Sequence, residues 1–324
     1  MVDGISAPSH TAHPTVFDAL ADRLRNVPTA PWLFWQPGWK WRWYAWQDVG
    51  DRVARGVAAM GERADSARFG EPDPVRVAFA EDATPDAVIT SLTLQAAGAV
   101  AVPIPGTPST PRVEPLELQR RAVDLGCDFW ADVVAPEAPS TEAVPKSSTT
   151  ADHTLPMLPL PPSLDALRIP DYRAPAVERP GGVWLDGVHC PAQDLLASAE
   201  VLGGLLAPDD PSKTAERPIL CSGSDLDPRL VQSLTAATVA TDTAWVLEPV
   251  ASAFPAIVRW ARPTAVVASA AVLEDLAPTL KPSRRHFRLR TVVVADGAHL
   301  SSSAHDRFAG LGVTVHPWPL ETAT

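Results

Sequence analysis

The chain is poor in the residues that form covalent cross-links and metal sites. Its 324 residues include three cysteines, Cys127, Cys190 and Cys221, which are odd in number and far apart. No Cys-x-x-Cys pair and no Cys/His ligand spacing occurs, so neither a disulfide framework nor a structural zinc site is indicated. The eight histidines form no His-x-x-x-His or His-Glu-x-x-His pattern, so these motifs give no support to metal catalysis.

Positive charge and long apolar runs are also scarce. Lys and Arg number 27 against 38 Asp and Glu, which gives a net charge of −11. This balance argues against sequence-independent binding to nucleic acid phosphates or to an anionic membrane. Residues 1–14 lack the basic and apolar regions of a secretory signal, and the most apolar windows, 96–105 and 264–273, are too short to span a bilayer. We expect a cytoplasmic protein that binds neither nucleic acid nor membrane.

Proline and tryptophan, by contrast, are abundant. Proline occurs 35 times, about twice its usual share of roughly 5%. Six of the 11 tryptophans fall within residues 32–46, in a run that alternates around Pro37-Gly38 and predicts a β-hairpin. The alternation places Trp39, Trp41 and Trp43 on one face of that hairpin. Two interpretations stay open for this face, a packed surface or a stacking surface for a ligand or partner protein.

Helical and strand patterns alternate along most of the chain, which favours parallel sheets with helical crossovers. Helices are predicted after Thr15, after Tyr44, and over residues 85–97, 114–125, 191–206, 228–239, 254–260, 271–276 and 302–309. Strands are predicted over residues 75–80, 99–104, 128–133, 183–185, 219–221, 244–247, 265–268, 291–294 and 313–315.

The composition of the chain changes between residues 136 and 180, and this change divides the pattern. The range is rich in proline and in Ser/Thr clusters, so it cannot sustain a helix or a central strand and predicts an extended linker. We therefore predict an α/β protein with two βα-alternating subdomains and mainly parallel sheets flanked by helices. Residues 1–135 would form the first, with the Trp-rich hairpin, and residues 181–324 the second.

Several phrases, in this order, resemble the AMP-forming acyl-CoA synthetases, which are adenylate-forming ligases. QAAGAVAVPIP at Gln95–Pro105 resembles that family's "kaGavyvPl", and LRTVVVADGAHLS at Leu289–Ser301 resembles its "LR.v.sGGApL". Further matching phrases lie at Tyr44–Gly61, Ser233–Pro249 and Trp260–Ala277. The resemblance covers nearly the whole chain and implies the large N-terminal domain of that family.

The family's phosphate-binding loop, [ST]SG[ST]TGxPKGV, is not reproduced. Its glycines let backbone N–H groups reach the phosphates, its hydroxyls donate hydrogen bonds, and its lysine supplies charge. Here only PGGV at Pro180–Val183 resembles the end of the loop, and Gly181 stands at the lysine position. Residues 173–179 read RAPAVER, without a glycine or a hydroxyl. The comparison predicts that a normal ATP site is absent.

A second motif is altered near the end of the sequence. WPLET at Trp318–Thr322 resembles the family's "YGxTE", in which the aromatic residue stacks on adenine, the Thr touches phosphate and the Glu binds magnesium. By this resemblance Trp318, Glu321 and Thr322 would contact a nucleotide, and Glu321 would hold Mg²⁺. An incidental carboxylate in a tail is the other interpretation. The turn at Asp296, Gly297 and Ala298 would pass beside the adenine, with Asp296 in place of a glycine.

Two functional hypotheses follow. The sequence ends at Thr324, whereas the family continues with a β-barrel and a domain that carries a catalytic lysine. Together with the altered loop, this leads us to expect a pseudoenzyme with no catalytic residue, which binds a small carboxylate or acyl ligand, or a partner ligase, in the crevice between the subdomains. The alternative is an active acyl- or aryl-CoA ligase completed by a separate C-terminal-domain protein. Only that alternative implies ATP or AMP and Mg²⁺ as cofactors.

Overall fold

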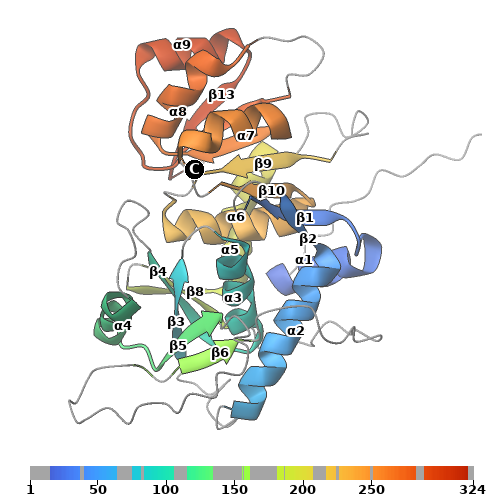
Figure 1. Cartoon of the computed structure of the whole chain (residues 1–324), viewed down its shortest axis with the longest axis vertical. Helices are drawn as coiled ribbons and strands as arrows, with labels where there is room; N and C mark the ends of the chain where they lie inside the picture. The colour runs from blue at the N-terminus through green and yellow to red at the C-terminus, as the bar shows by residue number, and fades with distance from the viewer. Residues whose placement is uncertain are drawn as a thin grey trace, which may run out of the picture.

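A computed structural model describes most of the chain, in segments that carry all of the sheets and helices discussed below (Figure 1). The described residues are 15–36, 40–63, 75–81, 84–105, 115–133, 155, 157–160, 181–185, 187–206, 217–223, 226–248, 251–281 and 288–319. Within them, no helix is both long enough and apolar enough to cross a bilayer.

The first sheet has seven strands in the order β13-β12-β11-β9-β10-β1-β2. All neighbouring strands pair in parallel except β1 and β2, which form the antiparallel hairpin that the tryptophan alternation predicts. The strands are β1 (Pro31–Trp35), β2 (Arg42–Ala45), β9 (Ile219–Ser222), β10 (Ala244–Leu247), β11 (Ala265–Ala268), β12 (Thr291–Val294) and β13 (Thr314–Pro317).

The second sheet has six strands in the order β6-β5-β3-β4-β7-β8, and only β7 and β8 pair antiparallel. Its strands are β3 (Arg76–Glu81), β4 (Val100–Pro105), β5 (Phe129–Val133), β6 (Met157–Leu160), β7 (Gly182–Leu185) and β8 (Val188–Pro191). Strand β6 lies inside the range predicted as a linker. It is an edge strand, where Pro159 is tolerated because one side of the strand needs no ladder hydrogen bonds.

Helices cover both faces of the sheets. They are α1 (Val16–Asn26), α2 (Trp46–Arg63), α3 (Pro85–Ala96), α4 (Pro115–Asp124), α5 (Ala192–Leu206), α6 (Pro228–Thr241), α7 (Phe254–Ala261), α8 (Ala270–Leu276) and α9 (Ser302–Gly310), with 3-10 turns at Ala251–Ala253 and Ala277–Thr279. Helix α1 begins where the sequence predicts, because the Thr15 hydroxyl caps it by accepting from the Asp18 N–H at 3.2 Å.

Three apolar clusters join these layers. The largest fills the space between the two sheets and holds α1, α2, α3, α5 and α6 (Figure 1). A second packs α7, α8 and α9 on the outer face of the seven-stranded sheet, and a third packs α4 on the outer face of the six-stranded sheet. The layers therefore alternate helices and sheets, and the α/β class with mainly parallel sheets is confirmed.

Each sheet draws strands from both sides of the predicted linker. Hairpin β1–β2 joins the sheet otherwise built from residues 219–317, through parallel pairing of β1 with β10. Hairpin β7–β8 joins the sheet otherwise built from residues 76–160, through pairing of β7 with β4. Most of residues 136–180 lie outside the described residues, so the predicted division of the chain stays a prediction.

Candidate functional site

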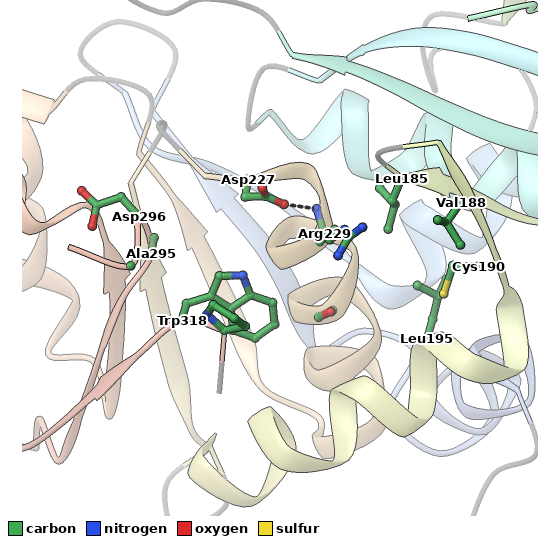
Figure 2. Close-up of a pocket in the computed structure, with 12 residues that line it drawn as sticks. Leu185, Val188, Cys190, Leu195, Asp227, Arg229, Ala295, Asp296 and Trp318 are labelled. Carbon is green, nitrogen blue, oxygen red and sulfur yellow. Dashed lines mark hydrogen bonds between the residues drawn. The ribbon is translucent and has the colours of Figure 1, made fainter. Parts of the chain in front are cut away.

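A cavity of about 750 Å³ opens between the two sheets, beside the C-terminal ends of β12 and β13 (Figure 2). Ligand sites of open α/β sheets lie at such strand ends. Three elements surround it: the β7–β8 hairpin with the start of α5, the first turns of α6, and the turns after β12 and β13. The described lining residues are Leu185, Val188, Cys190, Leu195, Asp227, Arg229, Ser233, Ala295, Asp296, Gly297, Trp318 and Pro319.

One wall of the cavity is apolar. Leu185 from β7, Val188 from β8 and Leu195 from α5 lie together on one side, and Trp318 lies across the cavity from them (Figure 2). Trp318 is partly buried against the main core, and its main-chain N–H donates to the Val294 carbonyl at 2.9 Å. Strand pairing therefore fixes the main chain at Trp318, and packing against the core holds its indole.

Helix α6 and its N-cap residue supply two of the charged groups of the cavity. Asp227 caps the helix, and its Oδ1 accepts from the Arg229 N–H at 2.7 Å. Among the described lining residues, Arg229 carries the positive charge, and Figure 2 shows it between Asp227 and the apolar wall. Burial and, to a smaller extent, Asp194 raise the pKa of the Cys190 thiol, and the Arg229 guanidinium opposes them.

The structure brings three of the predicted site residues to this cavity. Asp296, Gly297 and Trp318 line it, whereas Ala298 is not among the lining residues. Gly297 adopts a φ of +64°, and a Cβ added there would lie 3.1 Å from the Trp318 carbonyl oxygen. Glycine is favoured here because both the conformation and the close approach disfavour a larger side chain.

Asp296 has a structural task in the same turn. Its Oδ2 accepts from the Ala270 N–H at 3.1 Å, at the start of α8, and its Oδ1 accepts from the Ala298 N–H at 3.2 Å. Both carboxylate oxygens are thus engaged by the main chain. Glu321 and Thr322 lie outside the described residues, so their predicted roles toward phosphate and Mg²⁺ stay predictions.

Gly181 stands at the position that the resemblance assigns to the phosphate-loop lysine. Its Cα packs directly against the main chain of a neighbouring segment. A Cβ built on Gly181 would lie 1.8 Å from the Ala99 carbonyl oxygen. The Gly181 N–H donates to the Gln95 carbonyl at 2.9 Å, and its own carbonyl accepts from the Ala192 N–H at 3.2 Å. A side chain at this position would require the main chain to shift. Residues 173–180, the rest of the predicted loop, lie outside the described residues.

The residues at the positions of the family's phosphate loop do not fit a triphosphate. Position 181 provides no cation, and the sequence at 173–179 provides no glycine or hydroxyl for phosphate oxygens. Within the described ranges, no group of three or more His, Cys, Asp or Glu residues is placed to hold a metal ion. The cavity instead combines an apolar wall with a guanidinium, a combination that suits a carboxylic acid.

The sequence did not lead us to predict Asp227, Arg229 or the apolar wall as parts of the site. The Asp227-Pro228 pair is a helix-start signal, with an N-cap residue followed by a proline at the first helical position. Placed after strand β9, that signal marks a strand-end site. Nothing comparable marks Leu185 or Val188, because their place in the cavity depends on which strand the hairpin joins.

No protein-family model and no curated protein sequence matches the chain. Solved structures do match, at sequence identities below 25%, so these matches show the fold alone. The crystal structure of CmiS6 has a TM-score of 0.63 and 18% identity, and covers 97% of this chain and 73% of its own. VinN in complex with L-aspartate has a TM-score of 0.60 and 16% identity, with coverages of 93% and 74%.

A fatty acyl-adenylate ligase from L. pneumophila, solved with acyl adenylate and pyrophosphate, has a TM-score of 0.62 and 12% identity. The match covers 94% of this chain and 54% of the ligase. The chain therefore has the fold of the adenylate-forming enzymes, as the resemblance predicts, and spans about half to three quarters of the length of these three proteins.

Proposed function

We propose that this protein is a catalytically degenerate relative of the adenylate-forming ligases that binds a small carboxylate or acyl ligand and does not use ATP. The observation that carries the proposal is the cavity between hairpin β7–β8 and Trp318, with Arg229 beside an apolar wall. A guanidinium can engage a carboxylate through two parallel hydrogen bonds. The apolar wall supplies contact area for an acyl or aryl group of modest size.

The charges of the lining support an acid over a nucleotide. Asp227 and Asp296 both carry carboxylates at the cavity, and both already accept hydrogen bonds from the main chain. A triphosphate brings several negative charges, which two nearby carboxylates disfavour. A monocarboxylate brings a single negative charge, so it meets less of this repulsion, and it can bind beside the Arg229 guanidinium.

The altered sequence of the phosphate loop supports the second half of the proposal. A partner polypeptide could supply a lysine or a further domain, but it cannot place glycines at positions 173–179. Nor can it open space at Gly181, where the Ala99 main chain lies against the Cα. This favours a ligand-binding protein over a ligase completed by a second chain.

A thermal-shift panel tests the proposal. We expect hexanoate or benzoate to raise the melting temperature, because a ligand that binds only the folded state stabilises it. The matching amides lack the negative charge and are expected to have little effect. Arg229→Gln should abolish the acid-dependent shift, whereas Arg120→Gln, which changes an exposed side chain of helix α4, should leave it unchanged.

Two results would overturn the proposal. Equal shifts for acids and amides, or for wild type and Arg229→Gln, would remove the carboxylate site. Pyrophosphate exchange by the purified chain that depends on both ATP and an acid would show a working ligase and support the alternative.

A further inference from the structure

The hairpin β1–β2 carries an aromatic surface that the proposed cavity does not use. Trp41 stacks on Trp260 from α7, with ring centroids 4.4 Å apart and an interplanar angle of 7°. Trp43, two residues further along the chain and within β2, is 57% exposed, and Trp260 is 56% exposed. We call these three residues the tryptophan edge. From the sequence, the face with Trp39, Trp41 and Trp43 could be either a packed surface or a binding surface. In the structure Trp41 is packed and Trp43 is exposed, and Trp39 lies outside the described residues.

The tryptophan edge lies on one face of the sheet. Trp43 pairs with Phe34 of β1, and Phe34 packs into the cluster beneath α7, α8 and α9, as does Trp41. Residues two apart on an extended strand point to the same side. The indoles of Trp41 and Trp43 therefore lie on the face of the sheet that α7 covers, at its last strand, β2.

The main chain of this strand adds a second feature. Strand β2 ends the order of the seven-stranded sheet, so within the described residues one of its sides faces no further strand. Edge strands of this kind accept an extended segment of another chain through main-chain hydrogen bonds. Exposed aromatic side chains next to such an edge provide anchors for alternate side chains of the added segment.

The charges near β2 indicate which kind of partner segment would bind there. Residues 40–45 and 251–262 contain Lys40, Arg42, Arg259 and Arg262 and no Asp or Glu, in a chain whose net charge is −11. Arg42 and Arg259 are both exposed, and each is the direct sequence neighbour of a tryptophan of the edge. These cations, together with two exposed indoles, complement an acidic segment that carries apolar side chains.

We propose that the tryptophan edge and strand β2 form the docking surface for an extended, acidic segment of a partner protein, added as a strand beside β2. A second copy of this chain fits less well. A two-fold contact would bring Arg42 and its neighbouring cations against the same cations of the other copy, which costs energy. Charge complementarity therefore favours a partner with acidic and apolar residues in alternation.

Fluorescence anisotropy with a labelled peptide tests this surface on the full chain. The probe is an eight-residue peptide, Ser-Glu-Phe-Glu-Val-Glu-Phe-Ser, and its controls are the same peptide with Lys for Glu and the same peptide with N-methylated backbone nitrogens. We expect the acidic probe to bind, and both controls to bind about tenfold more weakly or not at all. Raising the salt concentration should weaken the acidic probe's binding.

Variants locate the binding. Arg42→Glu and Trp43→Ala should each raise the dissociation constant of the probe about tenfold, because each removes a contact at the surface. Arg120→Glu on α4 changes the charge by the same amount elsewhere, and should leave binding unchanged. Thermal melting of each variant checks that it folds, and Trp43 is exposed enough for its loss to be tolerated.

Three results would overturn the proposal: no binding of the acidic probe, equal binding by wild type and Arg42→Glu, or equal binding of the N-methylated peptide. A concentration-dependent dimer that Arg42→Glu abolishes would also overturn it, in favour of a second copy. None of these outcomes depends on whether the cavity binds an acid, because the two sites share no residue.

Discussion

Gly181 lies against the main chain of Ala99, so closely that a Cβ on Gly181 would be 1.8 Å from the Ala99 carbonyl oxygen. This contact joins the end of α3 to the start of α5, since Gly181 also exchanges hydrogen bonds with Gln95 and Ala192. The resemblance to adenylate-forming ligases assigns a phosphate-binding lysine to this position. Here the position has become a packing point between two helices and β7.

Adding a side chain at Gly181 should therefore destabilise the fold. We expect Gly181→Ala to lower the free energy of unfolding by about 1–3 kcal/mol, the usual cost of overpacking a filled site. Gly204→Ala is the matched control, because Gly204 lies in α5 with nothing within 4 Å of an added Cβ. It should raise stability by roughly 0.5–1 kcal/mol. Urea unfolding measures both, and a Gly181→Ala variant as stable as wild type would refute the contact.

The ion pair of Arg217 and Asp242 should matter more than exposed pairs. Their Nη2 and Oδ1 atoms are 2.6 Å apart, and the same Oδ1 accepts from the Trp46 indole at 3.1 Å. Burial lowers the pKa of Arg217, and Asp242 opposes this. Asp242→Asn keeps a residue that tolerates the φ of 53° but removes the charge.

We expect Asp242→Asn to cost about 1–3 kcal/mol, because a largely buried guanidinium loses its counter-charge. Glu117→Gln, in an exposed pair with Arg120, should cost less than about 0.5 kcal/mol. Chemical denaturation of the two variants compares them directly. Equal effects would mean that the Arg217 pair is no stronger than a surface pair.

Stability should fall on the alkaline side of pH 9. Burial raises the pKa of the Cys127 thiol from its ordinary value of 9.0 to about 11. The folded state thus holds this proton more tightly than the unfolded state does, so the contribution is complete below pH 9 and is lost as the pH rises to about 11. Urea midpoints between pH 8 and pH 11 should decline less steeply in Cys127→Ala. An unchanged slope would contradict the burial of this thiol.

The Trp41–Trp260 stack should show a measurable coupling energy. A double-mutant cycle with Trp41→Ala and Trp260→Ala isolates the pair from the individual losses of apolar area. We expect a coupling of about 0.5–1.5 kcal/mol, the usual range for aromatic pairs. The exposed Trp43 offers a control, since Trp43→Ala combined with Trp260→Ala should be additive to within about 0.5 kcal/mol.

The local sequence predicts elements well where apolar runs are short and bounded. Strands β10, β11 and β12 have the predicted bounds, because each is a run of four residues between helical patterns. Strand β6, MLPL, escapes prediction because it lies in a proline-rich range without alternation. The sequence does not predict which sheet each strand joins, for another reason. The pairing of Leu33 with Trp245 joins residues far apart in sequence, and apolar patterning does not specify strand partners.

The candidate site divides in the same way. A motif with local geometry, the Asp296-Gly297 turn, could be predicted, and the structure places it at the cavity beside Trp318. The apolar wall could not, because Leu185 and Val188 reach the cavity only after hairpin β7–β8 has joined the six-stranded sheet. Local signals mark turns and helix starts, whereas a crevice between two sheets depends on long-range pairing.

The most direct test of the account is an isothermal titration of the chain with a carboxylic acid and, separately, with ATP and Mg²⁺. We predict that hexanoate or benzoate binds with one site, that Arg229→Gln removes this binding, and that ATP with Mg²⁺ gives no binding heat. Saturable binding of ATP with Mg²⁺, together with acid binding that Arg229→Gln leaves intact, would contradict the central claim.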